Sequence, residues 1–306
     1  MIELEHAARN TGGRRIVDDV SFAVPAGAFC ALVGSSGAGK STTLKLINRL
    51  VPLSSGNIRV GDVDIETMAA EALRRRIGYV IQSIGLFPHW NVAQNIATVP
   101  RLLGWSETKI ADRTAELLAL VGLDPAHARR FPRELSGGQQ QRVGVARALA
   151  ADPELLLMDE PFGALDPLTR EALAKELHLI HRRMKKTILF VTHDIDMALE
   201  LADVIAIMHD GRLVQFGTPI EILERPASQF VRDFTGGASL GLKLLGVRRV
   251  GDRIRVEPAT AGEPLSPSAS LAEALSEMVV RQTDRLPVKG ENGAPGGSVT
   301  LSDLVR

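Results

Sequence analysis

The stretch GSSGAGKST, from Gly34 to Thr42, decides the fold of this chain. It follows FCALV (29–33), a continuously apolar run that predicts a strand buried on both faces. A helix is predicted directly after it from four apolar positions, Leu44, Ile47, Leu50 and Val51. A strand, a glycine-rich loop and a helix in this order predict a phosphate-binding loop, because glycines leave backbone N–H groups uncovered and the helix N-terminus adds positive potential.

The loop supplies the candidate nucleotide contacts. These are Gly34, Ser35, Ser36, Gly37, Ala38, Gly39, Lys40, Ser41 and Thr42. Lys40 is expected to reach the β- and γ-phosphates, and the Ser41 hydroxyl is expected to bind Mg²⁺. The sequence therefore predicts binding of MgATP or MgGTP, and the alternative is an ordinary glycine-rich turn.

Two carboxylates end a second apolar run, LLLM (155–158). Parallel strands bring such residues to the edge of the sheet where ligands gather. Asp159 suits an indirect contact to Mg²⁺, such as one bridged by water, and Glu160 suits a base that polarises the attacking water. Without a phosphate loop, the same acidic pair would more simply cap a helix.

The wider pattern predicts an α/β domain over residues 1–235. TILFV (187–191) is a third buried-strand candidate, and amphipathic stretches alternate with such runs, as in a parallel sheet with crossover helices. Helical periodicity dominates 88–151, so a helical subdomain is expected there; its apolar positions include Ile110, Leu117, Leu118 and Val121. Within it, LSGGQQQRVGVARALA (135–150) predicts a helix capped by Ser136, whose apolar face holds Val143, Ala146, Leu149 and Ala150.

Composition excludes several classes of protein. The 306 residues are 45% hydrophobic and 24% charged, which suits about two globular domains at roughly 150 residues each. Lys and Arg total 36 against 36 Asp and Glu, so no net field draws the chain to nucleic acid. No apolar run approaches the roughly 20 residues of a membrane span, no signal peptide is recognisable, and one cysteine, Cys30, allows no intrachain disulfide. We expect a cytoplasmic protein.

The amino-acid composition changes after FTGGASLG (234–241), and the following residues are richer in Arg, Ser, Pro and Gly. This change predicts a linker and a small second domain over 236–306. One amphipathic helix is expected at SLAEALSEMVV (270–280), and a loop at GENGAPGGS (290–298) before VTLSDLV (299–305).

Taken together, the motifs resemble those of the ATPase subunits of ABC transporters. The matching stretches are GSSGAGKST, YVIQS with Gln82, LSGGQ, LLLMDEP, ALD (164–166) and VTHD with His193. The resemblance implies an α/β P-loop NTPase with a RecA-like core, an inserted helical subdomain, and a homodimer that binds ATP at its interface. Ser136, Gly137 and Gly138 of one copy are then expected to face the γ-phosphate held by Lys40 of the other.

The resemblance also implies roles for three further residues. Gln82 would join Mg²⁺ and the attacking water to the membrane partner, His193 would hold the γ-phosphate, and Asp166 would line the dimer interface. The family usually stacks an aromatic residue on adenine, but Thr11 occupies that position here. Arg9 or Arg14 could stack instead, although we interpret both as solvated surface charges.

The stretch from Arg74 to Trp105 resembles the ATPases of osmoprotectant importers, which move glycine betaine, choline or carnitine. Its segment Phe87, Pro88, His89 and Trp90 suits a docking patch for the permease, with packing inside the subdomain as the alternative. The tail resembles one CBS module. In it Thr300, Ser302 and Asp303 could touch a ribose or simply cap a helix.

We therefore expect an ATP-hydrolysing subunit, peripheral on the cytoplasmic face of the inner membrane, that drives osmoprotectant import. Its expected partners are a second copy, permease subunits and, indirectly, a solute-binding protein, with no nucleic acid. The alternatives are the ATPase of a polar amino-acid importer and a nucleotide-sensing regulator that takes no part in transport.

Overall fold

A computed structural model describes residues 1–83, 85–163, 165–254, 262–290 and 295–304. The chain forms two compact units, Met1–Thr218 and Pro219–Arg306. Each unit has its own cluster of buried apolar side chains. The predicted end of the ATPase domain at residue 235 lies beyond the boundary between these units, and it stays a prediction.

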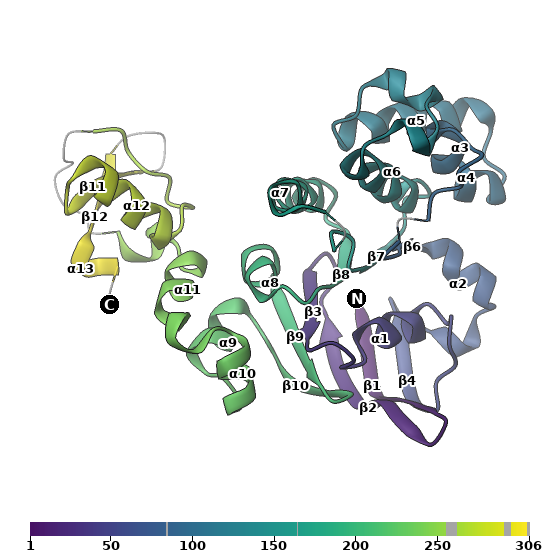
Figure 1. Cartoon of the computed structure of the whole chain (residues 1–306), viewed down its shortest axis with the longest axis horizontal. Helices are drawn as coiled ribbons and strands as arrows, with labels where there is room; N and C mark the ends of the chain where they lie inside the picture. Colours follow the sequence, from purple (N-terminus) through teal and green to yellow (C-terminus); the bar gives the residue numbers. More distant parts are fainter. Residues whose placement is uncertain (84, 164, 255–261, 291–294, 305–306) are drawn as a thin grey trace. The chain divides into compact units, whose positions relative to one another are not determined.

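A six-stranded sheet forms the centre of the first unit (Figure 1). Its order is β10-β9-β3-β8-β7-β6, and all neighbours are parallel except the hairpin of β9 and β10. The strands are β3 (Phe29–Gly34), β6 (Ile77–Val80), β7 (Leu155–Asp159), β8 (Thr187–Val191), β9 (Val204–His209) and β10 (Arg212–Gly217). Every residue of β3, β7 and β8 is buried, which confirms the three predicted buried strands.

A second, antiparallel sheet has the order β2-β1-β4-β5. Its strands are β1 (Ile2–Thr11), β2 (Arg14–Val24), β4 (Ser55–Val60) and β5 (Val63–Asp64). Helix α1 (Lys40–Ile47) contributes Leu44 and Ile47 to the apolar cluster that joins the two sheets. The predicted continuation of this helix to Leu50 and Val51 is wrong. Arg49 adopts a left-handed conformation with φ 47°, which ends the helix and leaves Leu50 exposed.

The helices predicted between residues 88 and 151 are present, in the part of the chain that connects β6 to β7 (Figure 1). They are α3 (Val92–Ile96), α4 (Thr98–Leu102), α5 (Glu107–Leu120) and α6 (Gly137–Leu149), with short 3₁₀ turns at Pro125–Arg129 and Pro132–Glu134. The predicted apolar positions Ile110, Leu117, Leu118 and Val121 are all buried. Elsewhere in this unit lie α2 (Ala70–Arg76), α7 (Pro167–Met184), α8 (Ile195–Leu201) and a 3₁₀ turn at Ile65–Thr67.

The second unit is helical with one two-stranded sheet. Its elements are α9 (Pro219–Glu224), α10 (Gln229–Phe234), α11 (Leu240–Val247), α12 (Leu271–Arg281), β11 (Arg285–Lys289), β12 (Pro295–Thr300), α13 (Leu301–Leu304), and 3₁₀ turns at Gly237–Ser239 and Val250–Arg253. The helix predicted at 270–280 is confirmed, with Ser270 as its N-cap. The predicted loop is wrong for 295–298, which pair with β11; its residues 291–294 lie outside the described part.

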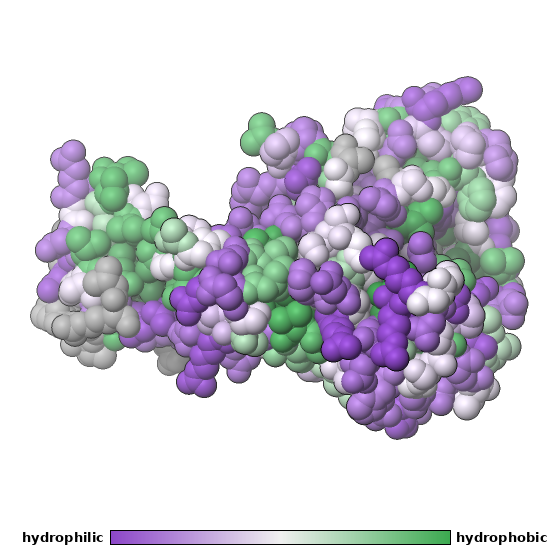
Figure 2. Space-filling model, turned by 60° about the horizontal axis from the view of Figure 1, so that its bottom comes forward, coloured by the Kyte–Doolittle hydropathy of each residue, from purple (hydrophilic) through white to green (hydrophobic). Residues whose placement is uncertain are grey.

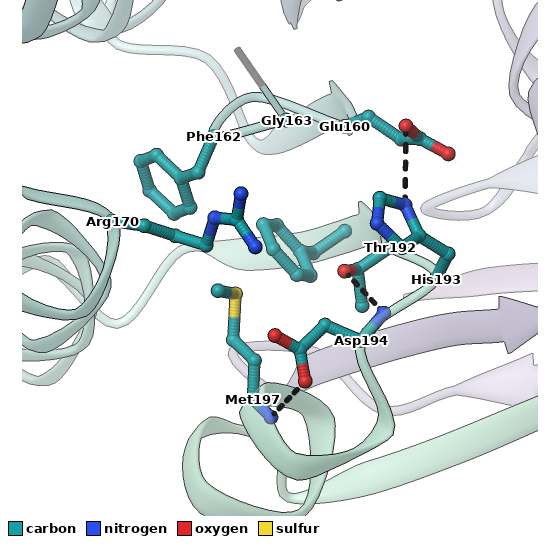
Figure 3. Close-up of a pocket in the computed structure, with 9 residues that line it drawn as sticks. Glu160, Phe162, Gly163, Arg170, Thr192, His193, Asp194 and Met197 are labelled. Carbon is teal, nitrogen blue, oxygen red and sulfur yellow. Dashed lines mark hydrogen bonds and ion pairs between the residues drawn. The ribbon is translucent and has the colours of Figure 1, made fainter. Parts of the chain in front are cut away.

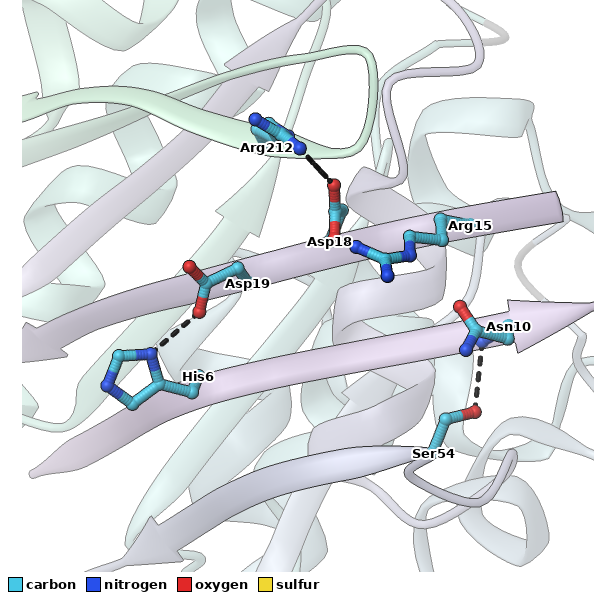
Figure 4. A network of polar contacts seen from close by, with 7 residues as sticks. All are labelled: His6, Asn10, Arg15, Asp18, Asp19, Ser54 and Arg212. Atoms are coloured by element: carbon cyan, nitrogen blue, oxygen red, sulfur yellow. Dashed lines mark hydrogen bonds and ion pairs between the residues drawn. The ribbon is translucent and has the colours of Figure 1, made fainter.

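Asp18 joins the two sheets near the turn of the β9–β10 hairpin (Figure 4). Its carboxylate accepts hydrogen bonds from Arg15 at 2.7 Å and Arg212 at 2.8 Å, and its backbone N–H donates to the Gly211 carbonyl at 2.8 Å. These two arginines hold the pKa of Asp18 below its ordinary value of 3.8. Among the residues that the structure describes, the neighbouring Asp19 pairs only with the exposed His6.

We predict that Asp18→Asn destabilises the protein at neutral pH, because the two guanidinium groups lose their anionic partner. A carboxyl whose pKa is lower in the folded state stabilises the fold at pH values above its unfolded-state pKa of 3.8. That contribution is lost as the pH falls through the folded-state pKa. The difference in unfolding free energy between wild type and variant should therefore shrink in acid, as measured by urea denaturation over a pH series. Asp19→Asn is the matched control and should change little. A difference that stays constant with pH would contradict this role of Asp18.

Candidate nucleotide-binding site

The predicted phosphate loop connects β3 to α1, and its glycines are required by the packing around them. Gly34 has φ +150°, and a Cβ there would lie 2.1 Å from the Met208 carbonyl oxygen. Gly39 has φ +94°, and its Cβ would lie 2.5 Å from the Ile16 carbonyl oxygen. Any side chain at these two positions would push the loop away from β9 and β2, so the sequence selects glycine.

Lys40 lies inside this loop. It is only 5% exposed, and its Nζ donates to the carbonyls of Gly34 and Ser35, both at 2.8 Å. Burial lowers the pKa of Lys40, and the carboxylates of Glu160 and Asp159 act in the opposite direction. The ammonium is therefore held where it can meet a phosphate chain that lies over the loop.

The two carboxylates after LLLM have different surroundings, which suit different roles. Asp159 is buried at the end of β7, and its Oδ1 accepts a hydrogen bond from the Ser41 hydroxyl at 2.7 Å. Glu160 has φ +43°, which is strained for a residue with a side chain, and its N–H donates to the Val191 carbonyl at 3.1 Å. This turn of the backbone directs the Glu160 side chain toward the end of β8 (Figure 3).

Two predicted residues, each from the end of a different strand, lie beside Glu160. Gln82 follows β6, and its Nε2 lies 3.4 Å from Glu160 Oε2. His193 follows β8, and its Nδ1 lies 3.3 Å from the same oxygen. The parallel sheet thus places an amide, a carboxylate and an imidazole at one edge, which suits the positioning of a water molecule for attack.

The oxygen donors near the loop fit a magnesium ion. Ser41 and Asp159 are already in contact through their oxygens, and Gln82 lies beside Glu160. Mg²⁺ prefers a few protein oxygens together with phosphate and water, and it does not need a dedicated protein cage. The described residues contain no cluster of three or more His, Cys, Asp or Glu that could hold a metal by themselves.

A cavity of about 820 Å³ lies over the phosphate loop. Its lining residues come from four parts of the chain and are Ser36–Thr42 of the loop, Gln82 and Glu160 at the strand ends, Arg14–Ile16 of β2, and Asp210 and Gly211 of the hairpin turn. The size and polar lining suit a nucleoside triphosphate.

Thr11 is not among the residues that line this cavity, whereas Arg14 is. Arg14 is exposed, as expected for a solvated surface charge, and it also lines the cavity because the hairpin at Gly12 and Gly13 returns β2 toward the phosphate loop. Arg9 is half-buried and donates to the Pro52 carbonyl at 3.0 Å. Sequence reasoning also missed Asp210 and Gly211, for which Asp-Gly signals only a hairpin turn.

The remaining candidates lie outside this cavity. Ser136 caps α6, accepting from Gln139 N–H at 3.3 Å, and Gly137 and Gly138 form the first turn of that helix. Asp166 caps α7, and the hydrogen bonds it accepts at Thr169 lower its pKa. Within one chain the structure does not bring these residues to Lys40, and Ala164 of the ALD motif lies outside the described residues.

Phe87, Pro88 and His89 are exposed, and Trp90 is half-buried. The rings of Phe87 and Trp90 lie 4.5 Å apart between centroids. The buried Asn95 organises the segment, because its side chain bonds both the N–H and the carbonyl of Phe87 and the carbonyl of Trp90. The structure therefore favours a surface patch over packing inside the subdomain.

Comparison with known proteins agrees with this geometry. Residues 17–163 match the family model described as ABC transporter. The chain is 53% identical over 305 residues to the glycine betaine uptake system ATP-binding protein YehX of Escherichia coli (strain K12), covering 100% of this chain and 99% of the relative. It is 47% identical to the glycine betaine/carnitine/choline transport ATP-binding protein OpuCA of Bacillus subtilis (strain 168), covering 98% of this chain and 78% of the relative.

Solved structures lead to the same conclusion. The ATP-binding cassette MJ0796, in a dimeric post-hydrolysis state bound to ADP and Pi, is 30% identical with a TM-score of 0.64, and the match covers 72% of this chain and 99% of that one. The phosphate loop, the carboxylates that end β7 and the histidine after β8 thus occur in the fold to which the resemblance pointed. The chain belongs to the ABC transporter family, as one of its ATP-binding proteins.

Proposed function

We propose that this chain is the ATP-hydrolysing subunit that energises an importer for quaternary-ammonium osmoprotectants such as glycine betaine or choline. The observation that carries the motor function is the meeting of Gln82, Glu160 and His193 beside the cavity over the phosphate loop. The cargo rests on the 53% identity, over the whole chain, to a glycine betaine uptake protein.

In this mechanism Lys40 binds the β- and γ-phosphates in exchange for its present bonds to the loop carbonyls. Glu160 accepts a proton from the attacking water, and His193 holds the γ-phosphate in line with that water. Ser41, Asp159 and Gln82 would hold Mg²⁺, directly or through water, and the bound ion would neutralise charge on the phosphates. ADP and inorganic phosphate leave when the site opens.

The complete site is proposed to need a second copy of the chain. Ser136, Gly137 and Gly138 lie away from the cavity of their own chain, although a helix N-terminus with bare N–H groups suits a γ-phosphate. The dimeric state of MJ0796 supports a homodimer in which each copy completes the other's site. Asp166, at the start of α7, would then lie at the interface.

The exposed patch of Phe87, Pro88, His89 and Trp90 is proposed to receive the permease subunits. It follows Gln82 by only a few residues, so a movement of the permease would reach the catalytic edge directly. Hydrophilic residues cover most of the first unit's face in Figure 2, which favours contact with the permease through a local patch. The patch would place the chain at the cytoplasmic face of the inner membrane, where a solute-binding protein supplies cargo from the other side.

No described helix is long and apolar enough to cross a membrane.

The second unit is proposed to contain a single CBS-like module. Its support is the order α12, β11, β12, α13 around a shared apolar cluster. Asp303 accepts a hydrogen bond from the Thr300 N–H at 3.0 Å, which favours the simpler interpretation of these residues as a helix cap. A regulator that senses nucleotide and takes no part in transport, or a polar amino-acid importer, remains the alternative to osmoprotectant import.

Glu160→Gln should retain ATP binding while hydrolysis falls about 100-fold or more, within the roughly 10²–10⁴-fold contribution of a general base. The amide keeps the shape of the side chain but cannot take the proton. Phosphate release and binding of a fluorescent ATP analogue measure the two effects separately. Turnover at the wild-type rate would remove Glu160 as the base.

Lys40→Ala should weaken ATP binding about tenfold or more, because a charge-assisted contact worth roughly 1.5–3 kcal/mol is lost. Equilibrium titration with the same fluorescent analogue checks the prediction. Lys45→Ala, on the exposed side of the same helix, is the control and should bind normally. Equal affinity in the Lys40 variant and wild type would contradict the phosphate-loop role.

Cells that carry the wild-type chain should take up labelled glycine betaine or choline, more strongly at high osmolarity, and Glu160→Gln should abolish this uptake. The experiment uses the two solutes, at low and high osmolarity, with the permease co-expressed. Uptake that continues unchanged with Glu160→Gln, while the purified wild-type chain hydrolyses ATP, would refute import of these osmoprotectants. It would leave the proposed ATPase activity in place. A chain that does not co-purify with permease would favour the regulator.

A further inference from the structure

Arg170 lies in the first turns of α7, four residues after Asp166. Its side chain lines a small cavity together with Glu160, His193 and Asp194 (Figure 3). Its Nη2 donates to the Leu165 carbonyl at 3.1 Å. The guanidinium therefore lies between the segment that carries Glu160 and the segment that carries His193.

One donor of this guanidinium is not used by the described residues. The Nε of Arg170 is buried and has no hydrogen-bond partner among them. Arginine stays charged in proteins, and a buried unpaired donor costs roughly 1–3 kcal/mol or more. Such groups are rare in folded proteins, so each one needs an explanation.

Two carboxylates face the cavity. Glu160 Oε2 is already approached by Gln82 and His193. Asp194 accepts a hydrogen bond from the Met197 N–H at 3.1 Å through one oxygen, Oδ1, as the N-cap of α8. Figure 3 shows its other oxygen directed into the space in front of Arg170. In Figure 3 a terminal nitrogen of the Arg170 guanidinium, and not Nε, faces this oxygen, so Asp194 is an acceptor on which the guanidinium can close.

We propose that Arg170 is a positioning residue for hydrolysis: its guanidinium holds the Leu165 carbonyl with one N–H and pairs with Asp194 through another when phosphate is bound. Asp194 directly follows His193, so this pair sets the position of the imidazole at the γ-phosphate. Leu165 directly precedes Asp166, which is expected at the dimer interface. The same guanidinium therefore connects the position of the imidazole to the position of that segment. The inference rests on the proposed ATPase function.

The test compares ATP hydrolysis by the purified full chain in wild type, Arg170→Met, Asp194→Asn and the double variant. Methionine keeps the length of the side chain and removes the charge, while asparagine keeps the N-cap of α8. Each single variant should lower kcat about tenfold with KM for ATP within about twofold, since only positioning of the reaction is lost. The double variant should be no slower than either single variant, because both remove the same pair.

Arg170→Lys should regain part of kcat, since an ammonium can reach one acceptor but lacks the fork that spans two. Lys175→Met, on the exposed surface of the same helix, is the matched control and should leave kcat unchanged. Thermal unfolding and ATP binding of each variant report whether the fold is intact.

Losses that multiply in the double variant, or an Asp194→Asn enzyme with wild-type kcat, would overturn the pairing. So would an Arg170→Met variant whose only defect is instability. Hydrolysis by wild type that depends on Glu160 supports the proposed function whichever of these results is found. A wild-type chain that does not hydrolyse ATP overturns both proposals.

Discussion

Parallel pairing of β3, β8 and β7 is the constraint on which the rest of the first unit depends. Leu32 of β3 is paired with Val191 of β8, and Val191 is paired with Asp159 of β7, so the three strands end at the same level. The phosphate loop, Glu160 and His193 each follow directly from one of these ends. A shift of one residue in either pairing would turn the side chains to the opposite face and disperse the site.

The site is held together by polar contacts that a nucleotide would replace. Lys40 is buried and is satisfied by two carbonyls of its own loop, and Ser41 is satisfied by Asp159. Buried polar groups need such partners, so the loop keeps its shape without a ligand. In the proposed mechanism, phosphate and cation would exchange with contacts that already exist, so little of the chain would have to be ordered when they bind.

The positions of α6 and α7 explain why one chain is proposed to hold half of the machinery. Both helices begin with a side-chain cap, Ser136 in one and Asp166 in the other. Neither cap lies in the cavity over the phosphate loop of the same chain. Arg170 gives α7 a second role, since it reaches from the start of that helix to the cavity beside His193. In the proposed mechanism, this side chain would relate the dimer interface to the catalytic histidine.

Local patterns in the sequence determined the buried strands, the phosphate loop, the capped α6 and the apolar face of α5, because these depend on spacing and on nearest neighbours. They failed for the end of α1, where a left-handed Arg49 breaks the helix, and for 295–298, which join β12. Only the tertiary structure decided that Gln82, Glu160 and His193 meet, that Arg14 lines the cavity, and that Arg170 faces Asp194. Those contacts join residues far apart in the chain, and their geometry is set by sheet register and helix packing, which local sequence patterns do not specify.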